Sequence, residues 1–262
     1  MSEISKYSVP NLERALTIME HLSQYSRGAT QAELCAEFGY PKNSVYRICS
    51  SLVEQGYVQK DNDNQKFTLT RKLLAVAYGA LSDDNLLELA LPVMRRIRPV
   101  VQETLLLGTL LEDEGLVLAE LAGTHHFNFR VERGARFYLH CTAPGKALLA
   151  FLPEEEQERY LNSIDYQIFN ENTHKSKASL KKDLHEIKER GVAYDYAEQL
   201  DGCHCISAPI FDQQGYPIAA IWTTGPSNRL KKENFELIGD QLLSAAMDVS
   251  KQLGYQLLEL KK

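Results

Sequence analysis

The sequence predicts an α+β protein in which a helical N-terminal domain precedes a larger domain built on a β-sheet. Up to Gln55 the apolar residues recur three or four positions apart, which is helical spacing. From Glu103 onward apolar runs of strand length alternate with helical stretches, and residues 232–253 have the length of one long helix. The chain has 262 residues, enough for two domains, and its 44% hydrophobic and 24% charged content is ordinary for a globular protein.

The first expected helix follows Pro10, and Asn11 is its candidate N-cap. Arg27-Gly28 interrupts the helical pattern. The apolar stripe of this first helix is predicted to comprise Leu12, Ala15, Leu16, Met19 and Leu22.

A second helix is expected to begin at Thr30, since Glu33 three residues later completes a capping box. Gly39 ends this helix, and Pro41 follows where a helix cannot continue. A third helix then runs from about Lys42 to Gln55, with Gly56 as its stop. Its apolar stripe is Val45, Ile48, Leu52 and Val53.

Two strands, 57–60 and 66–69, flank the Asp- and Asn-rich tip "DNDNQ". Three helices followed by such a hairpin form the winged helix-turn-helix arrangement, in which the third helix can enter the major groove of DNA. The polar N-terminal end of that helix and the two lysines of the hairpin are therefore candidate contacts to phosphates and bases. These predicted DNA-binding residues are Lys42, Asn43, Ser44, Tyr46, Arg47, Lys60 and Lys66. The alternative is a solvated polar face on an ordinary three-helix bundle.

Net charge gives this interpretation little support by itself. The whole chain carries −6, and residues 1–72 carry +1, with nine basic against eight acidic side chains. The N-terminal part is thus the less acidic one, but it is no basic patch. The prediction of DNA binding therefore depends on where individual basic and polar side chains lie.

The remaining chain reads as a connector and a sheet domain. Helices are expected at 69–78 and 86–98, and the predicted domains are 1–70, a linker helix at 71–85, and 86–262. Predicted strands lie at 104–111, 116–121, 127–131, 192–196, 205–211 and 218–224. Predicted helices lie at 146–151, 153–162, 179–190 and 232–253.

The N-terminal stretch lacks an apolar core with a small-residue cleavage site, and no apolar run is long enough to span a bilayer. These features predict a cytoplasmic protein without a membrane partner. The five cysteines are then expected to be thiols rather than members of a disulfide framework.

Five stretches in order resemble the isocitrate lyase regulator (IclR) family of bacterial transcription factors. They are "VPNLERALTIMEHL", "YPKNSVYRICSSLVEQGYV", "LHCTAPGKALLAFLP", "GCHCISAPIFDQQGYPIAAIWTTGP" and "LGY". The resemblance covers nearly the whole chain. It implies a winged helix-turn-helix, a linker helix and a GAF-like effector-binding domain. It also implies a homodimer or homotetramer that binds double-stranded operator DNA, often as a repressor, and responds to a small organic acid.

The alternation of strand residues agrees with the pocket that the resemblance implies. Cys203, Cys205 and Ser207 share one face of their strand, and Trp222 and Thr224 share one face of the next. The opposite wall matches "TAPGKA" at a helix start, where free amide groups favour an anion. The implied effector-binding residues are Ala143, Pro144, Gly145, Asp195, Cys203, Cys205, Ser207, Trp222 and Thr224.

Two departures from the family pattern argue against a plain small keto acid as effector. The position of Trp222 is usually small in the family, so the indole narrows the pocket, offers a stacking face, or is simply a core residue. Pro144 removes one amide donor. A sugar acid or an aromatic acid is the resulting expectation, with no other cofactor.

Other chemistries are open at the cysteines. A zinc- or thiol-dependent sensor or enzyme domain would use Cys141, Cys203 and Cys205. His204 faces away from the neighbouring cysteines, which disfavours a Cys–His pair and hence an enzyme. "APGK" is similar to the end of a phosphate-binding loop. That motif needs a glycine five residues before Gly145, where this sequence has His140, so nucleotide hydrolysis is excluded. For zinc, the expected histidine is His125, His126 or His140.

Overall fold

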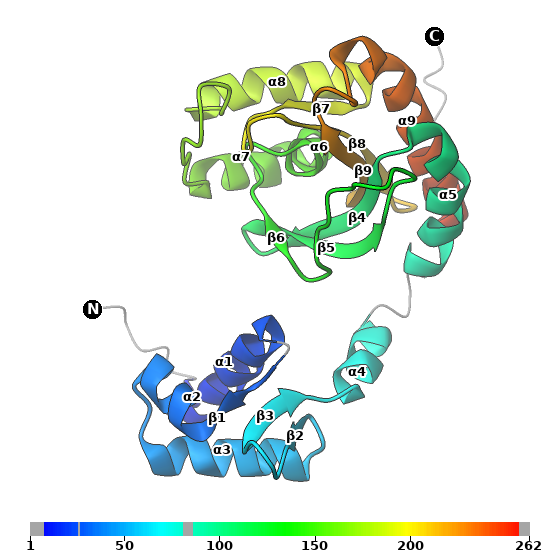
Figure 1. Ribbon diagram of the computed structural model, residues 1–262. Helices are drawn as coiled ribbons and strands as arrows, with labels where there is room; N and C mark the ends of the chain where they lie inside the picture. Colours follow the sequence, from blue (N-terminus) through cyan, green and yellow to red (C-terminus); the bar gives the residue numbers. More distant parts are fainter. Residues whose placement is uncertain (1–7, 26, 81–85, 257–262) are drawn as a thin grey trace. The chain divides into compact units, whose positions relative to one another are not determined.

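The computed structural model describes residues 8–25, 27–80 and 86–256. The chain divides into two compact units, residues 1–83 and 84–262 (Figure 1). This division falls within the segment 71–85 that the sequence predicts to be a linker. The mixed helix and sheet content confirms the predicted fold class.

The first unit is a three-helix domain with a small antiparallel sheet, as predicted. Its sheet has the strand order β1-β3-β2, and β2 and β3 form the predicted hairpin. β1, which pairs with β3, is a two-residue strand that the sequence analysis missed. The elements are α1 (Pro10–Gln24), β1 (Ala29–Thr30), α2 (Gln31–Phe38), α3 (Lys42–Glu54), β2 (Val58–Lys60), β3 (Lys66–Leu69) and α4 (Lys72–Ala80).

The start and the buried face of α1 differ from the prediction. The helix begins at Pro10, and Val9 occupies the N-cap position without a side-chain cap, so Asn11 is not the cap. Leu12 and Leu16 are 56% and 50% exposed. Ala15 and Leu22 of the predicted stripe do pack in the core, and Ile18, which was not predicted, is fully buried between them. With these residues α1 packs on α3 and β3.

The residues that begin α2 and that end α2 and α3 are those predicted from the sequence. Thr30 accepts a hydrogen bond from the backbone N–H of Glu33, whose side chain bonds back to Thr30, so the capping box is complete. Gly39 has φ 63°, the left-handed conformation that ends α2. Gly56 takes φ 75° just after α3. The core that these elements enclose consists of Ile18, Leu22, Ala29, Leu34, Val45, Ile48, Cys49, Val58 and Phe67.

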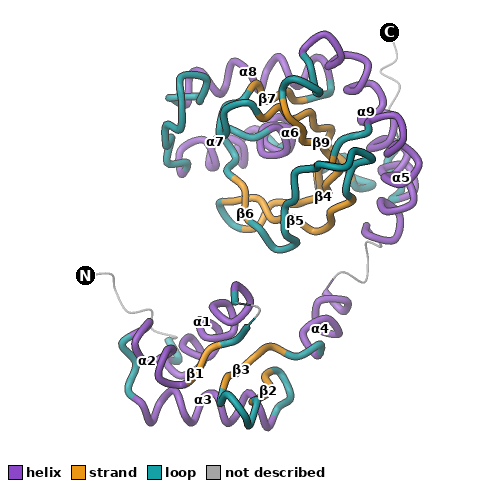
Figure 2. Tube along the Cα trace, viewed as in Figure 1, coloured by secondary structure: helices purple, strands orange, loops and turns teal. Residues whose placement is uncertain are grey.

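The second unit is built on one antiparallel sheet of six strands in the order β6-β5-β4-β9-β8-β7 (Figure 2). The central pair β4–β9 joins strands that are far apart in sequence, whereas β8 and β9 are consecutive strands that form a hairpin. The strands are β4 (Thr104–Leu111), β5 (Glu114–Leu121), β6 (Arg136–Phe137), β7 (Ala193–Tyr196), β8 (Cys203–Phe211) and β9 (Pro217–Pro226).

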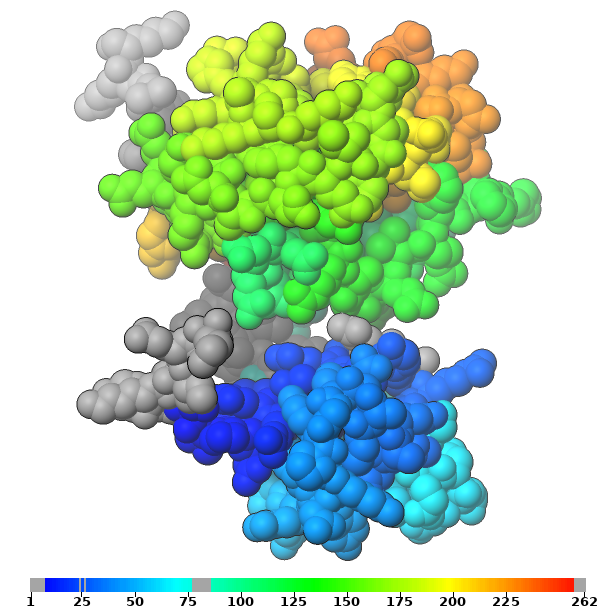
Figure 3. All heavy atoms as spheres, turned by 90° about the vertical axis from the view of Figure 1, so that its left-hand side faces the viewer, coloured from blue at the N-terminus to red at the C-terminus, as the bar shows by residue number. Residues whose placement is uncertain are grey.

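Helices cover both faces of this sheet, and each face has its own apolar cluster. α5 (Leu86–Val101) and α9 (Phe235–Gln252) pack on one face, with Ile206 and Ile221 beneath them. α6 (Ala143–Phe151) packs on the other, under α7 (Glu154–Ser163) and α8 (Lys177–Arg190). α7 and α8 form the green to yellow-green surface of this unit in Figure 3.

Two predicted elements of this unit need correction. Residues 127–131 form no strand; Phe127 is 74% exposed, and the carbonyl of Phe129 accepts a hydrogen bond from the Thr104 hydroxyl instead of from a neighbouring strand. The strand that pairs with β5 is the short β6. The last helix begins as a 3₁₀ turn over Lys232–Asn234.

None of the helices in the described ranges is both long and apolar enough to cross a membrane.

Gly28 and Gly39 allow a matched test of the packing between β1 and β3. Both have positive φ, 68° and 63°, but a Cβ on Gly28 would lie 2.4 Å from the carbonyl oxygen of Phe67, whereas nothing lies within 4 Å at Gly39. Gly39→Ala should cost about 1–2 kcal/mol, the backbone strain alone. Gly28→Ala should cost clearly more. Hydrogen exchange of the α2 and α3 amides measures both, and equal costs would contradict the close packing.

Candidate nucleic-acid interface and ligand site

α3 presents its polar end to solvent because its apolar stripe is buried. Val45 and Ile48 lie in the core, whereas Tyr46 is 60% exposed. Lys42, Asn43 and Arg47 are also exposed. Four of the five predicted contacts on this helix are therefore accessible to a partner.

Ser44, the fifth, is half-buried and already bonded. Its hydroxyl accepts a hydrogen bond from Arg14 Nη1 at 3.1 Å, and the Arg14 guanidinium lies 5.1 Å from the centre of the Tyr40 ring. Arg14 thus comes from α1 to the base of the predicted interface. Sequence analysis missed it, because only the tertiary packing of α1 on α3 brings it there. The α1–α3 groove, of about 500 Å³, is lined by Arg14, Asn43 and Arg47 among others.

A second groove, of about 520 Å³, brings three predicted residues from different elements together. Lys42 and Tyr46 line it from α3, and Lys60 from the hairpin. Lys60 Nζ lies 5.7 Å from the centre of the Phe67 ring, while Lys66, the first residue of β3 in the same hairpin, is half-buried. Gln31 and Gln65 line the same groove and were not predicted.

In the second unit the strand register places the predicted ligand residues in two rows on the α6 face of the sheet. Cys205 lies directly between Asp195 on β7 and Thr224 on β9. The next row on this face contains Ser207 and Trp222. The predicted alternation of faces is confirmed, since Cys205 and Trp222 pack in the cluster under α6.

Asp195 lies in an acidic, buried environment. Its carboxyl is 4% exposed, and its Oδ1 accepts a hydrogen bond from the Glu198 backbone N–H at 2.8 Å. Burial, and then the charge of Glu198, raise the pKa of Asp195 to about 7. Asp195 is therefore able to carry a proton at neutral pH.

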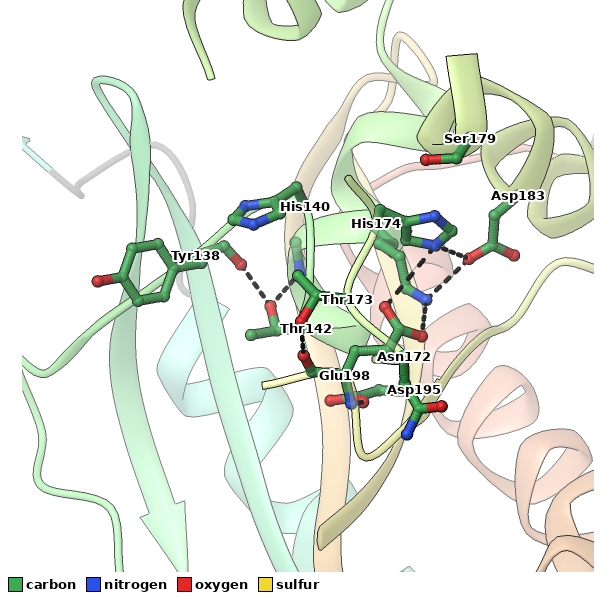
Figure 4. A network of polar contacts seen from close by, with 12 residues as sticks. Tyr138, His140, Thr142, Asn172, Thr173, His174, Ser179, Asp183, Asp195 and Glu198 are labelled. Atoms are coloured by element: carbon green, nitrogen blue, oxygen red, sulfur yellow. Dashed lines mark hydrogen bonds and ion pairs between the residues drawn. The ribbon is translucent and has the colours of Figure 1, made fainter. Parts of the chain in front are cut away.

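Lys146 is the buried cation of the site. Its side chain is fully buried, and its Nζ donates to Asp183 Oδ2 at 2.7 Å and also to Glu198 Oε1. Figure 4 shows Asp183 beside His174, whose Nε2 lies 3.2 Å from the same Oδ2. Burial disfavours the ammonium, but the charges of Glu198 and Asp183 outweigh it and raise the pKa of Lys146. The ammonium is thus already neutralised by protein carboxylates. Sequence analysis missed this role, although a lysine in an otherwise apolar helix was a signal.

The start of α6 offers fewer free amides than the sequence suggested. The Thr142 hydroxyl caps the helix and accepts from the Gly145 N–H at 3.3 Å, and Pro144 has no N–H. A Cβ on Gly145 would lie 2.5 Å from Leu139 Cα, so Gly145 is required by close backbone packing. Of the three predicted residues on this wall, only Ala143 keeps an amide that is not accounted for in this way.

Trp222 is packed into the apolar cluster and is 5% exposed. Its ring centre lies 5.3 Å from that of Phe137 in an edge-to-face arrangement. The indole therefore has a structural role at the boundary of the predicted pocket.

The cysteines predicted for zinc do not gather into a metal-binding set. Within the described residues, the group of three donors that lie within 4.8 Å of one another is His174, Asp183 and Glu198. Lys146 already bonds both carboxylates of that group. Cys141 is fully buried, and burial raises the pKa of its thiol to about 12.

The candidate zinc histidines have other partners or lie in the open. Nε2 of His140 lies 3.0 Å from the Gln167 carbonyl oxygen, and that of His125 lies 3.4 Å from Glu103. His126 is exposed. His204 bonds the Leu230 carbonyl on the α9 face, away from the cysteines, as its strand position predicts.

Two family profiles match the chain. Residues 11–62 match the IclR helix-turn-helix domain, and residues 78–251 match the bacterial transcriptional regulator IclR C-terminal domain.

Relatives cover almost the whole chain. The HTH-type transcriptional regulator KdgR of Escherichia coli is 30% identical over 248 residues, which are 95% of this chain and 94% of the relative. The transcriptional repressor IclR of the same species is 26% identical and matches 94% of this chain and 90% of its own length. An IclR homologue from Microbacterium hydrocarbonoxydans, solved with 4-hydroxybenzoate, shares the fold with a TM-score of 0.82 at 23% identity, covering 93% and 98% of the two chains.

The named relatives are transcriptional regulators and not enzymes. With an exposed third helix in the first unit and both family profiles matched in order, the chain belongs to the IclR family of bacterial transcriptional regulators.

Proposed function

We propose that this regulator is a cytoplasmic repressor that binds operator DNA as a homodimer or homotetramer. A small organic acid, a sugar acid or an aromatic acid, controls its operator affinity by binding beside Asp195, Cys205 and Thr224. No other cofactor is proposed.

The observation that carries the DNA part is the groove shared by α3 and the hairpin. Lys42, Tyr46 and Lys60 line it together, and Arg47 is exposed on the next turn of α3. Basic and aromatic side chains so arranged can bond phosphates while the helix reads bases in the major groove. Two copies of the chain would then read half-sites about one helical turn apart, or a multiple of that.

The ligand part rests on the chemistry of the site. Asp195 accepts a backbone hydrogen bond in a buried environment and carries a proton near neutral pH, so that it can donate to a carboxylate. One relative is named a transcriptional repressor, which supports repression rather than activation as the role of this protein. The coupling free energy between the DNA-binding and effector-binding sites would be about 1–3 kcal/mol, the range typical of allosteric proteins. Residues 70–85, which connect the two domains, would transmit this coupling.

Arg47→Ala should weaken operator binding by about 1–3 kcal/mol, or roughly 5- to 150-fold, and reduce its salt dependence, because an exposed guanidinium is lost from the interface. Gel-shift titrations at two salt concentrations measure both. Arg133→Ala removes the same charge from an exposed position in the second unit and serves as the control. Equal operator affinity of the two variants would contradict the assigned face.

Asp195→Asn should alter the pH dependence of stability. Folding raises this pKa from 3.8 to about 7, so the carboxyl stabilises the fold while protonated, and this contribution is lost as the pH rises between those values. The wild type should therefore lose stability relative to Asp195→Asn from about pH 4 to 7. Urea unfolding followed by the fluorescence of Trp222, the single tryptophan, measures the difference. A constant difference across this range would refute the buried acid.

Trp222 also reports on ligands. A panel of sugar, keto and aromatic acids should contain one class that gives a saturable fluorescence change, since the indole borders the proposed site. Ser207→Ala should weaken that response, because Ser207 lies in register with Trp222, and should leave operator affinity intact. A wild-type response in Ser207→Ala would place the ligand elsewhere.

A further inference from the structure

Two thiols on β8 share one hydroxyl group. Cys203 and Cys205 point to the same face, and Thr224 Oγ1 lies 3.2 Å from Cys203 Sγ and 3.3 Å from Cys205 Sγ. Cys205 donates to the threonine oxygen, which leaves the single hydroxyl hydrogen of Thr224 free to point at Cys203. The three groups thus form a chain of hydrogen bonds that ends on the sulfur of Cys203.

The two thiols in this set of hydrogen bonds have different pKa values. The neighbouring Cys205 and, to a smaller extent, the Thr224 hydroxyl lower the pKa of Cys203 to about 7, against the opposing effect of burial. The neighbouring Cys203 and burial raise the pKa of Cys205 well above its ordinary value. Cys205 therefore keeps its proton as a donor, and Cys203 is the sulfur that becomes a thiolate, the nucleophilic form.

The charged groups nearby come from three elements. Asp195 on β7 faces the pair and has a pKa raised to about 7, mainly by burial and partly by the charge of Cys203, so a thiolate at Cys203 and a carboxylate at Asp195 disfavour each other. Glu198, after β7, is engaged with Lys146 from α6. Cys141 keeps its proton because it is buried.

Cys203 and Cys205 are half-buried residues, unlike the fully buried Cys141. Within the part of the chain that is described, no third His, Cys, Asp or Glu donor completes a metal-binding group with them. An organic electrophile suits this pair better than a metal ion.

We propose that Cys203 binds the effector covalently and reversibly, by adding its thiolate to the carbonyl carbon of a sugar acid that has a free aldehyde or keto group. The S–C bond forms as the C=O π pair moves to oxygen, and the oxygen takes up the proton that the thiol gave up. The product is a hemithioacetal or hemithioketal, and no oxidant or other reactant is needed. The inference rests on the proposed effector function and names the chemistry of that site.

Alkylation tests the nucleophile without any ligand. The full-length protein is treated with iodoacetamide from pH 5 to 9, and modification of each cysteine is followed by peptide mass spectrometry. Cys203 should react with a midpoint near pH 7 and at least about tenfold faster at pH 7 than Cys35, which is also half-buried but lies in the first unit. Thr224→Val should move the midpoint upward, and Thr224→Ser, which keeps the hydroxyl, should restore it. If Cys203 reacts no faster than Cys35, the proposal fails.

Carbonyl addition is tested with glyoxylate, the smallest aldehyde acid, and with glycolate, the matching hydroxy acid. Glyoxylate should slow the alkylation of Cys203 at least about fivefold more than that of Cys35, and glycolate should not. Equal protection by both acids, or none by either, overturns the covalent step. Gel-shift assays of operator binding test the regulator function separately, so its failure and that of the covalent step can be distinguished.

Discussion

The ion pairs of Lys146 hold the ligand-facing half of the second unit together. The lysine projects from α6, and its two partners come from α8 and from the segment after β7, so one buried ammonium joins three parts of the fold. A buried charge is stable only with such partners, and removing both carboxylates would leave the cation uncompensated, at a cost of about 3–5 kcal/mol. The cluster also leaves Glu198 Oε2 without a hydrogen bond, 3.7 Å from His174 Nε2. The position of α6 beside the sheet, and with it the geometry around Asp195, depends on this balance of charges.

Local signals explain why much of the fold could be predicted. The capping box at Thr30 and the left-handed Gly39 are short-range features, and both are found as expected. The apolar stripe of α3 is confirmed in part, because Val45 and Ile48 are buried but Val53 is 37% exposed. The predictions from sequence were wrong where tertiary contacts, and not the local residue pattern, determine the structure. Residues 127–131 have strand-like composition, but no neighbouring strand is available to pair with them, because β6 takes the place beside β5. In α1, two faces have apolar residues at helical spacing, and only packing decides which one is buried.

The candidate sites divide in the same way. Strand alternation was enough to place Cys203, Cys205 and Ser207 on one face, since the period of two is fixed by backbone geometry. Arg14 at the base of α3 and Lys146 in its acidic cluster could not be found so, because their partners lie 30 or more positions away in the chain. The chemistry of the ligand site is thus more acidic and more fully hydrogen-bonded than a helix start with free amides would have been.

Trp222 and Gly108 form a size-complementary pair. A Cβ on Gly108 would lie 3.0 Å from Trp222 Cη2, 3.0 Å from Phe137 Cε1 and 2.6 Å from the Leu116 carbonyl oxygen, so the indole occupies space that a side chain on β4 would otherwise fill. Replacing the tryptophan alone would open a void, and enlarging the glycine alone would displace the ring. Changing the volume at this boundary of the candidate ligand site therefore calls for compensating substitutions on β4 and β9 together, because a change on either strand alone would leave a void or a clash.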